Sequence, residues 1–242
     1  MKYYYDFHIH SCLSPCGDND NTPNNIVGMA KISELDVVAL TDHNTVENCP
    51  AFFEAAKRLG VTAIAGMELT TSEEIHVVFL FENLKQAMDF NDEVKTRRIL
   101  IKNRVEIFGE QLILDGNDNV IGSEEHLLSN ATTISIEECV RLSLKYGGIC
   151  YPAHIDRDSN SIISVLGTVP RNLGFKCVEF RDKENIESFK EKYDLDGYTF
   201  LVDSDSHYLE NIRDKEAYIE LPDGQYSSET LTKKLLDKLK GV

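Results

Sequence analysis

Residues 1–17 read MKYYYDFHIHSCLSPCG, and the alternation at the start of this stretch predicts a β-strand with two unlike faces. Successive side chains of a strand point to opposite sides of the sheet. One face carries apolar side chains and the other polar ones: Tyr3, Tyr5, Phe7 and Ile9 against Asp6, His8 and His10. An unpaired polar group in a protein interior costs about 1–3 kcal/mol. The polar face therefore requires partners elsewhere in the chain.

Short runs rich in β-branched residues alternate with helical patterns, which is typical of βα units and a parallel sheet. The predicted strands are YYYDFHIH, DVVALT, VTAIAG, IHVVFLF, GGICYPA, FKCVEF and YTFLVD. Helix ends are marked by Thr22 with Pro23, by Gly60, and by the capping pair Ser135 and Glu138. The spacing favours an α/β protein with a small, incomplete TIM-like barrel over an open sheet.

The stretch 82–134 interrupts this alternation of strands and helices. It holds a long charged helical segment, LKQAMDFNDEVKTRRILIKNRVEIFGE, and then QLILDGNDNVIG, which predicts a hairpin around a Gly-Asn-Asp turn. We expect one domain over 1–242, with this helical and hairpin insertion packed over one end of the barrel. The sequence leaves open whether the insertion only stabilises the fold or forms a lid that shapes a pocket.

Composition limits the class of protein. The 242 residues carry a formal net charge of −16, which would repel a polyanion, so we expect no long nucleic acid as a partner. No apolar run is long enough for a membrane span, and no room for a signal peptide precedes the first strand. We therefore expect a cytoplasmic protein that binds no membrane, with no prediction of its oligomeric state.

The six cysteines are expected to be reduced thiols, because the sequence shows no secretory signal. Cys12 and Cys16 are spaced C-x3-C beside the first two histidines, so a metal role is conceivable. A small buried or loop thiol is the favoured interpretation, because an isolated spacing is weak support for a metal site.

Histidines and acidic residues gather at the ends of the predicted strands. This set comprises His8, His10, Asp42, His43, Glu68, His154, Asp205 and His207. The carboxyl ends of parallel strands meet at one edge, so these side chains should converge. His76 is an exception because it begins its strand, and His126 is expected on the surface. Gathered imidazoles and carboxylates favour Zn²⁺, Mn²⁺ or Fe²⁺ over Ca²⁺.

Six short motifs make the sequence resemble the PHP (polymerase and histidinol phosphatase) family of metal-dependent phosphoesterases. In chain order they are DFHIHS, TDHN, GMELT, HVVFL, PAHIDR and DSDSH. They extend from Asp6 to His207, which is nearly the whole chain. The resemblance implies a distorted seven-stranded TIM-like (β/α)7 barrel with two or three divalent metal ions, Mn, Zn or Fe, as cofactors.

The resemblance also implies how the ions are held. The ligand sets carried over for three ions are His8, His10, Glu68 and Asp205; then Glu68, His76 and His154; and then His43 with His207. Glu68 would bridge the first two ions. Relatives complete the third site with a carboxylate or histidine from the loop after the first strand, and here that loop is longer. Asp18 is the preferred candidate, ahead of Asp20 and Cys16.

The implied activity is hydrolysis of a phosphate ester by a metal-bound hydroxide. The candidate catalytic residues are Glu68, Arg157 and Asp42. We expect Arg157 to bind phosphate oxygens in preference to pairing with Asp156 or Asp158. We expect Asp42 to orient a metal ligand or to carry a proton. The predicted substrate is a small phosphomonoester, with nucleotides among the candidates. The alternatives are a phosphodiesterase or short-oligonucleotide nuclease, a histidinol phosphate phosphatase, and a non-catalytic metal-binding module.

Overall fold

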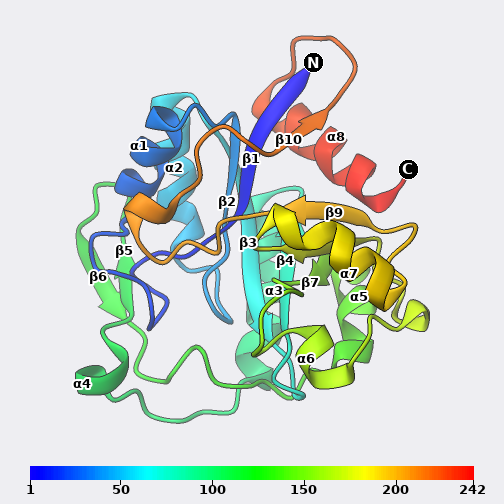
Figure 1. Ribbon diagram of the computed structural model, residues 1–242. Helices are drawn as coiled ribbons and strands as arrows, with labels where there is room; N and C mark the ends of the chain where they lie inside the picture. Colours follow the sequence, from blue (N-terminus) through cyan, green and yellow to red (C-terminus); the bar gives the residue numbers. More distant parts are fainter.

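Strand β1 (Lys2–Ile9) runs through the middle of the fold, in a computed structural model that describes residues 1–242 (Figure 1). Its pairing with the next strand shifts register between Asp6 and Ile9, as a β-bulge does. Tyr5 and Phe7 pack in one core cluster and Ile9 in another. The prediction of one continuous apolar face is therefore wrong at Ile9, because the bulge re-aims the end of the strand.

A curled sheet of six strands has the order β10-β1-β2-β3-β4-β7. Its other strands are β2 (Val37–Leu40), β3 (Thr62–Thr70), β4 (His76–Phe81), β7 (Gly148–Pro152) and β10 (Tyr218–Glu220). The parallel pair β8 (Cys177–Phe180) and β9 (Thr199–Val202) forms a separate sheet. All seven predicted segments form strands, and the α/β class is correct. A continuous seven-stranded barrel does not form, because β8 and β9 meet their neighbours only through isolated backbone bonds such as Ile155 N–H to Glu179 O, 2.8 Å.

Strand β4 runs antiparallel to both of its neighbours, contrary to the expected parallel sheet. Only residues 71–75 connect it to β3, which is too short for the crossover that parallel pairing needs. The first residue of β4, His76, is therefore in register with Thr70, the last residue of β3. This reversal explains how a histidine at the start of a strand reaches the edge where other strands end.

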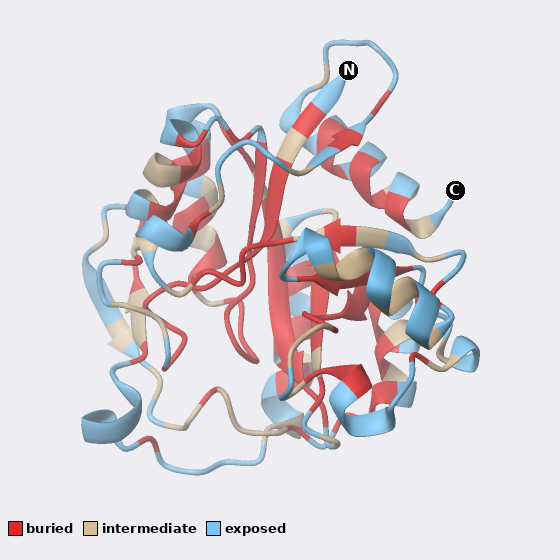
Figure 2. Cartoon of the chain, in the orientation of Figure 1, coloured by how far each residue is buried: buried red, intermediate tan, exposed pale blue.

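Helices cover the outside of the sheet and leave their outer sides exposed, whereas the strands are largely buried (Figure 2). The longer ones are α1 (Pro23–Ile32), α2 (Cys49–Leu59), α3 (Leu84–Arg97), α5 (Ile136–Lys145), α7 (Ile186–Tyr193) and α8 (Ser228–Lys240); α6 (Ile162–Leu166) is short. The predicted caps at Thr22, Gly60 and Ser135 are confirmed. None of the helices is both long and apolar enough to cross a membrane.

The 82–134 stretch contains α3, the single turn α4 (Val105–Phe108) and a hairpin of β5 (Leu112–Leu114) and β6 (Val120–Ser123), which confirms the predicted hairpin. The helix ends at Arg97 rather than continuing as expected. The chain then pairs with its own return through the bridges Arg98 to Thr132 and Lys102 to His126. This pairing overrides local helix propensity.

Two apolar clusters make up the core. One lies between the sheet and helices α1, α2, α3 and α5. The other joins side chains of the strands, such as Ile64 and Val78, to Leu235, Leu236 and Leu239 of α8. The Sγ of Cys177, at the start of β8, donates to the carbonyl of Leu239 at 3.4 Å. Helix α8 therefore covers the end of the sheet where the parallel strands begin.

Candidate metal centre

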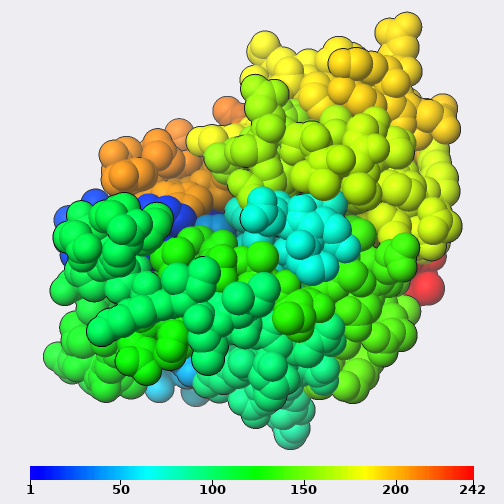
Figure 3. Space-filling view, turned by 90° about the horizontal axis from the view of Figure 1, so that it is seen from below, coloured from blue at the N-terminus to red at the C-terminus, as the bar shows by residue number.

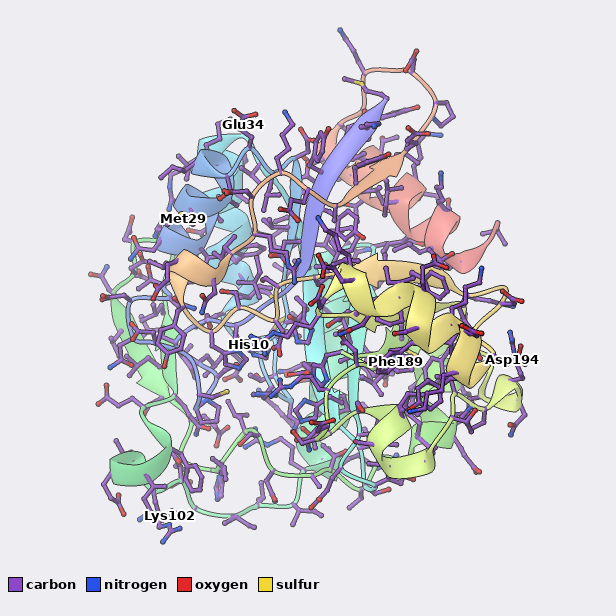
Figure 4. All side chains as sticks on the ribbon, viewed as in Figure 1. His10, Met29, Glu34, Lys102, Phe189 and Asp194 are labelled. Carbon is purple, nitrogen blue, oxygen red and sulfur yellow. The ribbon has the colours of Figure 1, made fainter.

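Two histidines at the end of β1 define the opposite end of the sheet. The Nε2 atoms of His8 and His10 lie 3.1 Å apart, and both rings are fully buried. Each Nε2 lies 3.3 Å from a carboxylate oxygen of Glu68, and they lie 3.6 and 3.5 Å from Oδ1 of Asp205. Figure 4 shows the labelled His10 in the interior, below β1. The structure thus brings together the four residues predicted for the first ion.

Glu68 lies at the centre of the cluster. Its Oε1 is 2.8 Å from Nδ1 of His76 and 3.1 Å from Nε2 of His154, and its Oε2 is 2.9 Å from Nδ1 of His43. The residues predicted for the second ion therefore also meet. A carboxylate with each oxygen facing a different group of imidazoles is placed to bridge two cations.

Several buried nitrogen and oxygen atoms of the cluster have no hydrogen-bond partner. Glu68 Oε2 and His43 Nδ1 are only 2.9 Å apart but do not form one, and Nδ1 of His154 is also without a partner. Buried polar atoms in proteins are nearly always paired. Lone pairs that converge without a shared proton are suited to a cation. This nitrogen and oxygen donor set fits divalent ions such as Zn²⁺, Mn²⁺ or Fe²⁺.

Charge within the cluster shifts the pKa values of these ligands in opposite directions. Burial alone would raise the pKa of Glu68, but the imidazoles of His76, His8 and His43 hold it well below its usual range. Burial alone would lower the pKa of His8, but the carboxylates of Glu179 and Glu68 raise it well above its ordinary value. Cations compete with protons for these imidazoles, so bound metal should weaken in acid.

Glu179 of β8 is a supporting residue that the sequence reasoning missed. Its Oε1 lies 2.9 Å from Nδ1 of His8 and accepts the backbone N–H of His154 at 3.2 Å. A carboxylate on Nδ1 fixes the tautomer and turns Nε2 toward the ions. The available signal was a glutamate within the run CVEF, whose other side chains are apolar.

Asp42 holds the loop after β1. Its Oδ1 accepts the N–H of Ser11 and the hydroxyl of Ser14, each at 2.7 Å, and the same Ser14 hydroxyl lies 2.9 Å from Nδ1 of His10. Asp42 therefore reaches the cluster through Ser14 and not directly. This placement is suited to the orienting role considered from the sequence.

Two residues of the cluster adopt a backbone conformation that residues with side chains seldom take. His154 has φ of 28° and Asp205 has φ of 50°. Such conformations cost about 1–3 kcal/mol each and gather at functional sites, where surrounding contacts enforce them.

Arg157 lies at the mouth of the cluster, with its side chain 38% exposed. Its Nη1 is 2.7 Å from Oδ2 of Asp205, so its ion pair is with a candidate metal ligand and not with Asp156 or Asp158. The Asp156 carboxylate instead accepts backbone N–H groups of Arg181 and Asp182.

The loop after β1 departs from expectation. Oδ1 of Asp18 accepts the N–H of Asp20 at 2.8 Å, and Asp18 is not among the side chains that converge. Cys16 is also outside the groups of converging ligand atoms, but it lines the hollow over the metal centre together with His43 and His207. Burial would raise the pKa of the Cys16 thiol, but these imidazoles lower it to about 5.

Comparison with known proteins identifies the family. The PHP domain family model matches residues 6–238. A 5′–3′ exoribonuclease of Haemophilus influenzae is 29% identical over 137 residues, which is 55% of this chain and 48% of that protein. The chain thus spans about half the length of this curated relative.

Solved structures share the fold at low sequence identity. Endonuclease Q of Pyrococcus furiosus has a TM-score of 0.70 and 17% identity, over 100% of this chain and 56% of that chain. A second endonuclease Q structure, in complex with a 27-mer duplex substrate with an abasic lesion, has a TM-score of 0.67 and 18% identity, over 100% and 57%. A structure described as a metal-dependent phosphoesterase from Bifidobacterium adolescentis has a TM-score of 0.61 and 18% identity, over 99% and 97%.

The endonuclease Q complex contradicts the prediction of a small phosphorylated partner and no long nucleic acid. A chain with this fold binds a 27-mer duplex. The prediction relied on the formal net charge of −16, which averages over the whole surface. The charge near the site is what a substrate meets, and Arg157, Arg181 and Arg213 line one hollow there.

Proposed function

Because the chain belongs to the PHP family, we propose that it is a metal-dependent phosphoesterase that hydrolyses phosphodiester bonds of nucleic acid. The observation that carries this proposal is that the hollow over the metal centre shares lining residues with two further surface hollows, which we together call the groove. A row of adjoining hollows suits a polymer strand, whereas small-molecule sites bury most of their ligand.

Three adjoining hollows form the groove. The hollow over the metal centre has a volume of about 360 Å³. It shares Arg157 and Arg181 with a second hollow of about 470 Å³, and Cys16 and Tyr208 with a third of about 620 Å³. Figure 3 shows the underside of the molecule, where the green insertion, the cyan connection of β3 to β4 and the yellow-green segment with α6 gather.

One end of the groove offers positive charge. Neither Arg181 nor Arg213 forms an ion pair with a carboxylate, and the guanidinium of Arg213 donates to the carbonyl of Arg181. Asp156 and Asp182 line the same hollow, but their carboxylates accept backbone N–H groups and form no ion pair with these two arginines. Unpaired guanidinium groups bind phosphate oxygens through charge-assisted hydrogen bonds.

The other end of the groove offers exposed aromatic rings. Tyr208 is 47% exposed and Phe108 of α4 is 37% exposed, and both line the third hollow. Nucleobases stack on such rings, which contributes about 1–3 kcal/mol per base. Since Phe108 belongs to the 82–134 insertion, we propose that this insertion shapes the groove as well as stabilising the fold.

Divalent ions at the cluster would lower the pKa of bound water and offset the charge of the phosphoryl group. The protein's own side chains would hold the ions and orient the phosphate group. Glu68 and the histidines supply the donors, Glu179 fixes His8, and Arg157 is within reach of a phosphate oxygen at the mouth.

The test uses Mn²⁺-loaded protein with end-labelled single-stranded and duplex oligonucleotides, a duplex with an abasic site, nucleoside monophosphates, nucleoside bisphosphates and histidinol phosphate. We expect shortened oligonucleotides, and no shortening by the His8→Ala/His10→Ala variant. Release of inorganic phosphate from the small esters alone would overturn the diesterase proposal and support the narrower phosphomonoester prediction. No turnover by metal-loaded protein would favour a non-catalytic module.

The groove itself is tested by Arg213→Ala, with Arg171→Ala as the matched control. Arg171 is 51% exposed and contacts Asp194 and Asp196, outside the three hollows. We expect Arg213→Ala to raise KM for oligonucleotides and to flatten the salt dependence of binding. Equal effects of both variants would contradict a groove that uses Arg213.

A further inference from the structure

Ser14, in the loop after β1, contacts three polar groups of the metal centre at once. Its hydroxyl lies 2.7 Å from Oδ1 of Asp42, 2.9 Å from Nδ1 of His10 and 3.2 Å from the backbone nitrogen of His43. Ser14 is fully buried, so no solvent competes for these contacts. A hydroxyl has one hydrogen to donate and two lone pairs that accept. The group that receives this hydrogen therefore decides where the proton lies on His10.

The direction of these hydrogen bonds can be followed from β5 of the 82–134 insertion. The backbone N–H of Leu114 donates to Oδ1 of Asn48 at 2.9 Å, so the Nδ2 of this amide is what faces the hydroxyl of Ser11, to which it donates at 3.0 Å. The Ser11 hydroxyl also accepts the N–H of Leu13 at 3.2 Å. Because both of its lone pairs are then used, its own hydrogen is donated to Oδ2 of Asp42 at 2.7 Å.

Asp42 accepts hydrogen bonds on both of its carboxylate oxygens. Its Oδ2 accepts the Ser11 hydroxyl, and its Oδ1 accepts the N–H of Ser11 and the hydroxyl of Ser14. The hydrogen of Ser14 is therefore donated to Asp42, and the N–H of His43 can only donate to the Ser14 oxygen. Nδ1 of His10 must then carry a proton and donate to the same oxygen at 2.9 Å. The lone pair of its Nε2 is left free for an ion.

We propose that a one-way hydrogen-bond relay fixes the tautomer of His10 and keeps its Nε2 directed at the first ion. The relay consists of Asn48, Ser11, Asp42 and Ser14. Ser14 is the positioning residue that contacts the ligand itself. Glu179 acts on His8 in the same way, but there a single carboxylate contacts Nδ1 directly. This proposal rests on the proposed function only in requiring a metal centre.

The relay also connects the insertion to the metal centre. Nδ2 of Asn48 donates to the carbonyl of Leu112 at 3.0 Å, and Leu112 and Leu114 both belong to β5. Asn48 and the other relay residues are buried, so the connection is shielded from water along its whole length. A change at the Asn48 end should therefore weaken the binding of the first ion.

The first test is the position of the proton. Long-range proton–nitrogen NMR spectra of Zn²⁺-loaded protein with isotope-labelled histidine show which ring nitrogen carries a proton. We expect a proton on Nδ1 of His10, whose signals are assigned by their absence in His10→Ala. A metal-bound His10 with its proton on Nε2 would overturn the relay.

The second test is metal affinity, measured without substrate by competition with a chelator. Ser14→Ala removes the acceptor for Nδ1 of His10, so the affinity should fall about 10- to 100-fold. Ser143→Ala is the matched control, because Ser143 is also buried but donates to the carbonyl of Val140 within α5. The control should keep the affinity of the unaltered protein. An unchanged affinity in Ser14→Ala would overturn the positioning role.

A double-substitution cycle separates a relay from independent packing effects. Asn48→Ala should lower the metal affinity by less than Ser14→Ala does. In the double variant the affinity should equal that of Ser14→Ala alone, because the relay is already interrupted at Ser14. Additive losses would mean that Asn48 acts by packing and would overturn the relay. No substrate is present in these measurements, so their failure is distinct from a failure of the hydrolysis assay.

Discussion

The two ends of the sheet are built from the same strands but from opposite chemistry. At one end, β1 and β3 finish in His8, His10 and Glu68, surrounded by loops and by an open groove. At the other end, the strands begin under α8, whose Leu235 is fully buried. One end carries donor atoms without partners, and the other carries closely packed side chains.

This difference shows how the fold separates binding from stability. In parallel α/β proteins the carboxyl ends of strands carry function and the opposite ends carry packing. The antiparallel β4 respects the same division, because reversing the strand puts His76 at the polar end and Phe81 at the packed end. Substitutions at the two ends should therefore change different measured quantities.

Glu68→Ala should have the largest effect. We expect loss of at least one ion by elemental analysis, and a fall in activity of at least about 10³-fold, beyond the 10- to 100-fold typical of losing a supporting contact. Glu82→Ala, at the packed end where Glu82 pairs with Lys240, is the control and should keep its metal. Full metal content in Glu68→Ala would contradict bridging.

Leu235→Ala should lower the stability of the protein and leave the metal centre intact. Removing a fully buried leucine costs about 2–5 kcal/mol in the free energy of unfolding, measured with urea. Metal content and the activity of the folded protein should stay unchanged. Leu144→Ala, on the exposed face of α5 at 64% exposure, should change stability by no more than about 0.5 kcal/mol. A loss of metal in Leu235→Ala would mean that the two ends are coupled.

Arg157→Ala should separate substrate binding from metal binding within the polar end. We expect a fall in kcat/KM of about 10²-fold, because a charged donor to the phosphate is lost, with the metal content unchanged. An unchanged kcat/KM would refute the phosphate role, and loss of metal would assign Arg157 to holding Asp205 instead.

Glu179→Gln should give the smallest change. The amide keeps the shape of the side chain but removes the charge beside Nδ1 of His8, so metal affinity should fall about 10- to 100-fold in competition with a chelator. The unfolding free energy of the metal-free protein distinguishes positioning from packing. An unchanged affinity would show that Glu179 only fills space.

The metal cluster could be expected from the sequence because strand ends in α/β proteins converge, and six short motifs supplied residues for those ends. His8, His10, Glu68 and Asp205 meet as expected. His76 could be named but not explained, because its position depends on an antiparallel strand that the alternation of segments did not reveal. In the sequence, only the short connection after Thr70 indicates that the strand of His76 runs antiparallel.

Two features could not be predicted because they depend on contacts between distant segments. The bulge in β1 follows from its pairing with β2, which moves Ile9 to another cluster. The position of the Cys16 side chain depends on how its loop is tied to the segment that carries His207. The prediction that excluded long nucleic acid as a partner failed for a different reason, since a net charge contains no information about where arginines gather.

Because β4 runs antiparallel to its neighbours, α3 must return the chain along the whole length of β4. The chain leaves β4 at the packed end, where Glu82 meets Lys240, and α3 carries it back until the carbonyl of Arg97 accepts the N–H of Thr133 beside the polar end. The 14 residues of α3 rise about 21 Å, close to the roughly 20 Å that the 6 residues of β4 cover. Deleting one helical turn would move the end of α3 back by about 5.4 Å, so the length of α3 determines whether the 82–134 insertion starts beside the metal centre.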